Sequence, residues 1–138
     1  MTINDPQTIE WVVSQPRVLA VVGLSDNPER PSYRVSVEMQ RRGYRIVPVN
    51  PKGGEVLGEK VYSSLTEIPF PVDVVQVFRA PQYAVDVVRE VGRMTTKPKV
   101  VWMQEGVVNE QAASEAEAMG LAVVQDLCLY KEAKKREQ

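Results

Sequence analysis

The sequence predicts a doubly wound, Rossmann-like α/β domain in which helices cover both faces of a five-stranded parallel sheet, a three-layer α/β/α arrangement. A chain of 138 residues is about one domain long. Short apolar runs rich in β-branched residues alternate with helical segments, the pattern of a parallel sheet buried on both faces. We expect one domain over residues 1–138 with strand order 3-2-1-4-5. The predicted strands are 18–22, 45–49, 73–78, 99–103 and 121–125.

Capping residues mark where the predicted helices begin. Asp5 precedes a proline, and Ser32 and Asn109 each precede a segment of helical pattern, so all three are expected to be N-cap residues. Apolar residues at 84, 87, 88 and 91 have the spacing of an amphipathic helix that starts at Pro81. The charged C-terminal tail, at about 131–138, is expected to be a surface helix that frays. The other predicted helices are 6–14, 33–42 and 110–119, with a short turn at 63–69.

The composition excludes several classes of function. Charged residues make up 25% of the chain and the formal net charge is −1, which gives no electrostatic reason to expect nucleic acid or an anionic membrane as partner. The chain has no histidine, which removes Ser-His-Asp and Cys-His catalysis together with the commonest general base and zinc ligand. We therefore expect no metal site and no catalytic residues.

The single cysteine, Cys128, cannot form a disulfide within the chain and suits a reducing compartment. No apolar run approaches membrane-spanning length, and the N-terminus lacks the pattern of a signal peptide. These features predict a cytoplasmic protein. The apolar neighbours of Cys128 favour a buried small side chain over a nucleophile, and Trp102 is expected in the core.

The predicted strand order puts a crevice between the carboxyl ends of 18–22 and 99–103, with "GLSDNPERPS" and "MQEGVV" on its two sides. Gly23 lets a ligand approach the backbone, and the helix that follows presents free N–H groups suited to phosphate. Ser25 and Ser32 add hydroxyl donors, while Arg34 and Arg30 add positive charge. The alternative reading is a plain strand-to-helix loop without a ligand.

Other strand ends add polar groups to the same crevice. The run 50–52, Asn50-Pro51-Lys52, stands where an NAD-binding domain usually carries an acidic residue for the ribose, so Lys52 suits an added phosphate or is simply solvated. Phe78 and Arg79 suit an adenine, with an edge of the core as the alternative for Phe78. Gln104 and the backbone at Gly106 suit the amides of an extended ligand. The acidic residues near strand ends, Asp26, Asp73, Glu105 and Asp126, form no visible acid–base pair.

Taken together, these stretches resemble the small single-domain CoA-binding proteins of the CoA_binding_2 type, which are related to the N-terminal CoA-binding domain of the succinyl-CoA synthetase α subunit. The resemblance runs from about Val18 to Cys128. It departs from the family at Leu127, where relatives often carry arginine. The motifs that carry it, in order, are "VVGLSDNPERPSYRV", "GYRIVPVNPKGGEVLGEKVYSSLTEIP", "VDVVQVFRAP", "VVWMQEGVVNEQAA" and "GLAVVQDLC".

The resemblance implies a bound coenzyme A and a role for each strand end. Gly23, Ser25, Ser32 and Arg34 would bind the pyrophosphate region. Asn50, Pro51 and Lys52 would hold the adenosine 3′-phosphate end. The adenine side would be lined by Phe78 and Arg79, and the pantetheine would be flanked by the segment from Gln104 to Gly106.

The resemblance does not supply catalysis, because succinyl-CoA synthetase relies on a phosphorylated histidine in another domain. The first hypothesis is therefore a CoA or acyl-CoA binding protein without activity of its own. The second is a CoA-binding component of an acyl-CoA synthetase-like enzyme that acts with a separate ATP-grasp chain. An NAD(P)-dependent oxidoreductase is disfavoured, because the chain has one glycine at the first loop and no acidic residue at the second strand's end. A second copy of the chain stays open as another partner.

Overall fold

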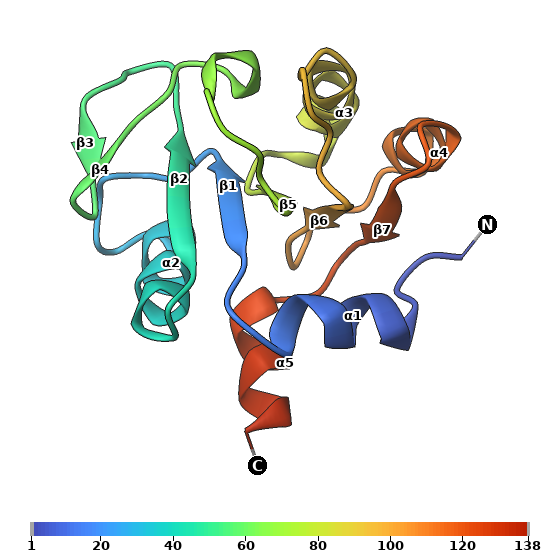
Figure 1. The fold of residues 1–138 in the computed structure, drawn as a ribbon, viewed down its shortest axis with the longest axis horizontal. Helices are drawn as coiled ribbons and strands as arrows, with labels where there is room; N and C mark the ends of the chain where they lie inside the picture. Colours follow the sequence, from blue (N-terminus) through green and yellow to red (C-terminus); the bar gives the residue numbers. More distant parts are fainter. Residues whose placement is uncertain (1, 138) are drawn as a thin grey trace.

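Five parallel strands form the central sheet of the structure, a computed structural model that describes residues 2–137 (Figure 1). These strands are β1 (Val18–Val22), β2 (Arg45–Val49), β5 (Val74–Val77), β6 (Val100–Met103) and β7 (Ala122–Val124). Two short strands, β3 (Glu55–Val56) and β4 (Glu59–Lys60), form a separate antiparallel hairpin. The helices are α1 (Pro6–Val13), α2 (Pro31–Arg41), α3 (Ala84–Gly92), α4 (Glu110–Ala118) and α5 (Leu129–Arg136).

The fold class and the five parallel strands are confirmed, but the strands are ordered differently from the prediction. The sheet reads β2-β1-β5-β6-β7, which is 2-1-3-4-5 when its five strands are counted along the chain. The predicted order put the third strand outside the second, whereas β5 pairs with β1. The segment between β2 and β5 holds only the hairpin and a single 3-10 turn at Leu65–Glu67, so no long helix carries the chain beyond β2. Strands are therefore added on one side of β1 up to β2 and on its other side from β5 onward, so the order of addition reverses between β1 and β5.

Two hydrophobic cores lie on opposite faces of the sheet and give the domain three layers. Alternate residues of each strand enter opposite cores, as the pleat requires: Ala20 lies in one core, and Leu19 and Val21 lie in the other. The α3–α4 face buries all four residues that the predicted amphipathic spacing singled out, at 84, 87, 88 and 91. Helices α1, α2 and α5 cover the other face (Figure 1). Because each strand is covered by a helical layer on both faces, its residues form a nearly unbroken apolar run in the sequence.

Two of the three predicted caps are present. The side chain of Asp5 accepts a hydrogen bond from the backbone N–H of Gln7, and that of Asn109 accepts one from the N–H of Ala112. The third prediction is wrong, because α2 begins at Pro31 with Arg30 at the N-cap position, and Ser32 lies inside the first turn. Proline at the first helical position needs no hydrogen-bond partner for its nitrogen, which favours this earlier start.

The charged tail forms a packed helix. In α5, Leu129 and Ala133 are buried against the core that α1 and α2 also cover, while the charged residues face outward. Its outer face is tied down by ion pairs, including Arg136 with Glu10 of α1. Among residues 2–137, no helix is long and apolar enough to cross a membrane.

Gly23 is the residue with the tightest steric requirement in the sheet. Its φ is +88°, and an added Cβ would lie 2.5 Å from the backbone oxygen of Phe78 at the end of the neighbouring strand. That oxygen belongs to the sheet and cannot rotate away as a flexible side chain could. The end of β1 therefore accepts only glycine without a shift of the backbone.

We predict that Gly23→Ala lowers the free energy of unfolding by about 1–3 kcal/mol more than Gly58→Ala does. Gly58 is the matched control, because its φ is also positive, +76°, but an added Cβ would meet nothing within 4 Å. Urea denaturation followed by tryptophan fluorescence measures both losses, since Trp102 is fully buried. Equal losses of unfolding free energy in the two variants would show that the close contact between the added methyl group and the Phe78 carbonyl oxygen does not destabilise the fold.

Candidate ligand-binding cleft

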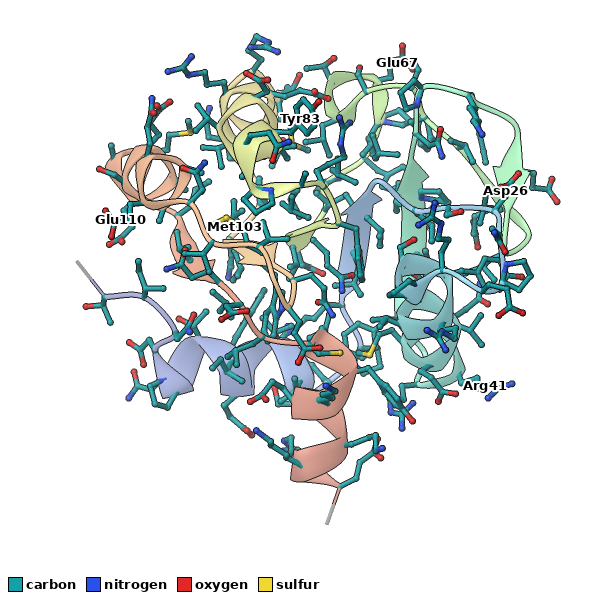
Figure 2. The ribbon with its side chains drawn as sticks, turned by 180° about the vertical axis from the view of Figure 1, so that it is seen from behind. Asp26, Arg41, Glu67, Tyr83, Met103 and Glu110 are labelled. Atoms are coloured by element: carbon teal, nitrogen blue, oxygen red, sulfur yellow. The ribbon has the colours of Figure 1, made fainter. Side chains whose placement is uncertain are left out.

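A cleft of about 1070 Å³, here called the main cleft, opens at the carboxyl ends of the strands. It lies over the reversal point between β1 and β5 and continues along α2 to the beginning of α5. Figure 2 labels Asp26, on the loop before α2, and Arg41, at the far end of this helix. The predicted site residues that line the main cleft are Gly23, Ser25, Ser32, Arg34, Phe78, Arg79 and Gln104.

A second, smaller cavity of about 220 Å³, here called the side cavity, adjoins the end of β2. Asn50 and Pro51 line it, and Gly23 and Arg79 line both cavities. The guanidinium of Arg79 stacks on the Tyr83 ring, 4.6 Å from its centroid. Gly23 and Arg79 thus lie where the two cavities meet, so one extended ligand in both would pass these residues.

The loop from β1 to α2 is held in shape by its serines. The hydroxyl of Ser32 accepts a hydrogen bond from the N–H of Ser25 at 3.0 Å, and the hydroxyl of Ser25 accepts one from the N–H of Asn27 at 3.0 Å. Each hydroxyl keeps its own proton available for donation. The two serines therefore shape the loop and also offer donors at the start of α2, where the positive end of the helix dipole favours an anion.

Two guanidinium groups beside this loop are not neutralised. Arg30 and Arg34 are exposed, both line the main cleft, and neither forms an ion pair with a carboxylate among residues 2–137. By contrast, Arg41 at the far end of α2 pairs with Glu38 at 2.9 Å. Among the residues that line the main cleft, unpaired positive charge therefore lies at the end nearest β1.

The 50–52 run is only partly in these cavities. The side chain of Asn50 donates to the Leu24 carbonyl at 2.9 Å and accepts from the N–H of Lys52 at 2.8 Å, so it joins the loop after β1 to the turn after β2. This positioning role was not foreseen from the sequence. Lys52 is exposed and lines neither cavity.

Gln104 forms the floor of the main cleft at the end of β6 and is 3% exposed. Its Oε1 accepts hydrogen bonds from Gln76 Nε2 at 3.1 Å and from the backbone N–H of Leu129 at 3.2 Å. The amide of Gln76 lies one strand away, is fully buried, and leaves its own Oε1 without a partner. Two buried hydrogen bonds thus connect β5, the end of β6 and the first turn of α5. Sequence analysis did not predict them, because Gln76 stands within a run that is otherwise apolar.

Gly106 lies outside both cavities. Its N–H donates to the carboxylate of Asp126 at 2.8 Å, which ties the loop after β6 to the loop after β7. The neighbouring Glu105 pairs with Lys131 of α5 at 3.0 Å. The hydrogen bond from Lys131 to Glu105 is the main reason that the pKa of the Lys131 ammonium lies above its ordinary value. The Cys128 sulfur acts in the same direction.

The acidic residues near strand ends have structural partners instead of one another, as expected. Asp73 accepts from the N–H of Val18 at 2.7 Å, Asp126 holds Gly106, Glu105 pairs with Lys131, and Asp26 is exposed. No pair among these four is arranged as a general acid and base.

The beginning of α5 adds residues that sequence analysis did not assign to the site. Cys128, Tyr130 and Lys131 all line the main cleft. Cys128 is 7% exposed and packs in the core, so it is both a buried residue and part of the cleft wall. Trp102 is fully buried, as predicted, and its Nε1 donates to the carbonyl of Leu127. The signal for α5 was available in the apolar run before the charged tail.

Comparison with known proteins agrees with this geometry. The family model described as "CoA binding domain" (CoA_binding_2) matches residues 17–134. Uncharacterized protein YneT of Bacillus subtilis (strain 168) is 44% identical over 121 residues, which are 88% of each chain. The structure of a hypothetical protein from Pyrococcus horikoshii OT3 superposes with a TM-score of 0.89 at 32% identity, covering 97% of this chain and 93% of that one.

A third relative is much longer. The alpha subunit of ADP-forming acetate–CoA ligase II from Pyrococcus furiosus is 32% identical over 87 residues, which are 62% of this chain and 19% of the subunit. The chain therefore corresponds to a small part of that protein. The family model covers the sheet, both helical layers and the cleft, which confirms the resemblance found in the motifs, and this chain belongs to the CoA binding domain family.

Proposed function

We propose that this protein binds coenzyme A or an acyl-CoA in the main cleft. The observation that carries the proposal is the graded character of the cleft, from the two unpaired guanidinium groups of Arg30 and Arg34 to the buried amide of Gln104 and the apolar side chains beyond it. Coenzyme A has the same polarity, with phosphates at one end and a pantetheine arm of amides and methylenes at the other. The donor set therefore fits this ligand, and the family assignment supports it.

The proposed contacts follow the strand ends. Gly23, Ser25, Ser32 and Arg34 bind the pyrophosphate at the start of α2, where the helix N–H groups add to the positive charge. Phe78 and Arg79 line the adenine side, at the junction of the two cavities.

The remaining contacts lie at the two ends of the ligand. Asn50, Pro51 and Lys52 hold the 3′-phosphate end, with Lys52 reaching in from the exposed turn. Gln104 and the loop at Gly106 flank the pantetheine, with Gln104 as the direct contact, because Gly106 is engaged with Asp126.

Isothermal titration calorimetry tests the ligand class. CoA should bind at least about tenfold tighter than NAD, a difference of about 1.4 kcal/mol, because the residues that follow β2, Asn50-Pro51-Lys52, include no acidic side chain for the ribose of NAD. Arg34→Ala should weaken CoA binding, whereas the matched control Arg93→Ala, an exposed arginine away from the cleft, should not. Equal affinity for CoA and NAD would remove the proposal.

Lys52 should bind the ribose 3′-phosphate, which CoA has and dephospho-CoA lacks. A lysine ammonium meets a phosphate as a point charge without bidentate geometry, and salt weakens such an exposed contact. The wild-type protein should prefer CoA by about tenfold or more, with the preference shrinking as salt rises. Lys52→Ala should narrow that preference, while Lys97→Ala, an exposed lysine on the loop before β6, should leave it unchanged. A preference that survives Lys52→Ala would assign the phosphate to Arg79 or Arg30.

We propose that the isolated chain neither hydrolyses nor transfers the acyl group of an acyl-CoA ligand. It has no histidine, and the two acidic residues that line the main cleft are in ion pairs, Glu38 with Arg41 and Arg42, and Glu105 with Lys131. Acyl-CoA thioesters incubated with the protein should stay intact when followed by a thiol-release assay. Hydrolysis that persists through repurification and disappears with Arg34→Ala would contradict this proposal.

A second candidate function is favoured by the ligase alpha subunit among the relatives. In that case the chain is the CoA-binding component of an acyl-CoA synthetase-like enzyme and supplies the ligand to a separate chain of the ATP-grasp type. Copurification from the native source distinguishes the two, since a stable ATP-grasp partner is required only by the second.

A further inference from the structure

The end of the main cleft, where β6 stops and α5 begins, has chemistry that binding alone does not require. Gln104 and Cys128 both line it, and both are more than nine-tenths buried. The inference drawn from them rests on the proposed function, because it concerns the thiol end of a CoA-type ligand in this cleft.

Gln104 offers a hydrogen-bond donor that no part of the protein uses. The backbone N–H of Leu129 can only donate, so the side-chain atom it contacts must be Oε1, and this fixes the orientation of the amide. With Oε1 already accepting from Leu129 and Gln76, Nε2 remains, and it has no acceptor among residues 2–137. Because Nε2 is not among the fully enclosed atoms without a partner, it faces the cleft that Gln104 lines, where an amide or thioester carbonyl of a ligand arm could accept its hydrogen bond.

Cys128 lines the same cleft as this donor. It is the residue directly before Leu129, whose N–H contacts Gln104, and it occupies the N-cap position of α5. Lys131, three residues further along α5, also lines the main cleft. The chain has one cysteine, so this thiol has no partner for a disulfide within the molecule.

We propose that Cys128 captures a CoA-type ligand covalently, by thiol–disulfide exchange with a disulfide of that ligand. The Cys128 sulfur, as its thiolate, attacks the sulfur of the bound half, and a new S–S bond forms as the bond between the two halves of the ligand breaks. The other half leaves as a thiolate with the electron pair of the broken bond and takes a proton from solvent. One disulfide is consumed and one is formed, so the step needs no further oxidant.

The site should select its disulfide by binding it first. A buried thiol reacts slowly with reagents that do not fit the cleft. A ligand held by the phosphate end of the cleft, with its carbonyl on Gln104 Nε2, brings its sulfur to Cys128 at a high effective concentration. Selectivity for a CoA-type disulfide is therefore the signature of this site, and generic thiol reactivity is not.

The test uses the reduced wild-type protein and intact-mass spectrometry. Equal concentrations of CoA disulfide and of oxidised glutathione are added separately, and the appearance of a mass increase equal to one ligand moiety is followed in time. CoA disulfide should react at least tenfold faster than oxidised glutathione, and dithiothreitol should reverse the adduct. Because Cys128 is the one cysteine of the chain, a disulfide adduct on the wild-type protein must be at Cys128.

Two measurements separate this inference from the proposed function. Cys128→Ser, with Cys128→Ala as a second variant, should form no adduct, and calorimetry on the reduced wild-type protein measures the binding of reduced CoA separately. If reduced CoA binds but CoA disulfide reacts no faster than oxidised glutathione, or gives no adduct, the capture by Cys128 is overturned and the binding function stands. If reduced CoA does not bind at all, the proposed function fails.

Discussion

The central position of β1 in the sheet is the constraint on which the cleft depends. It pairs with β2 on one side and β5 on the other, and its interior residues are fully buried, so the strand cannot shift without breaking both ladders. All five strands are parallel, so their carboxyl ends meet at one edge, and the order in which strands are added reverses between β1 and β5, beside Gly23. The absence of a side chain at Gly23 lets the Phe78 carbonyl approach and leaves both cavities open.

The far end of the cleft is held by a different kind of interaction. The Gln76–Gln104 pair takes the backbone N–H of Leu129, a group that would otherwise be an unsatisfied donor at the beginning of α5. A buried amide that loses its partner costs about 1–3 kcal/mol, so these contacts fix the position of α5 more strictly than apolar packing alone. The sheet thereby sets the distance between the loop after β1 and Cys128.

Local patterns in the sequence predicted most elements, because their causes are local. Asp5 and Asn109 cap their helices through side chains that reach residues two and three positions on, and the apolar runs coincide with the strands to within one residue at each end. The strand order was wrong because it depends on the connection from β2 to β5. The sequence contained that signal, a turn at 63–69 instead of a full helix, but a prediction based on the commonest order passed over it.

The site was predictable where its residues follow strands directly. Gly23, Phe78, Arg79 and Gln104 could be placed on one edge, because parallel strands all end there. Contacts between distant segments were not predictable, since no local pattern reveals that Ser32 holds Ser25 or that Asn50 reaches Leu24. For the same reason the contribution of α5 to the cleft was missed: its packing against α2 is a tertiary event.

The two outer strands of the sheet have consequences for how this protein can associate. Beside β2, the backbone of Tyr62 pairs with Val49, and Pro48 within β2 has no N–H to offer. Beside β7, Ile3 pairs with Val123. Exposed strand edges recruit other chains into a growing sheet, and both edges here are already engaged by the protein's own backbone. Each bridge occupies one residue of its edge strand, so the protein's own backbone blocks these two positions to pairing with another chain.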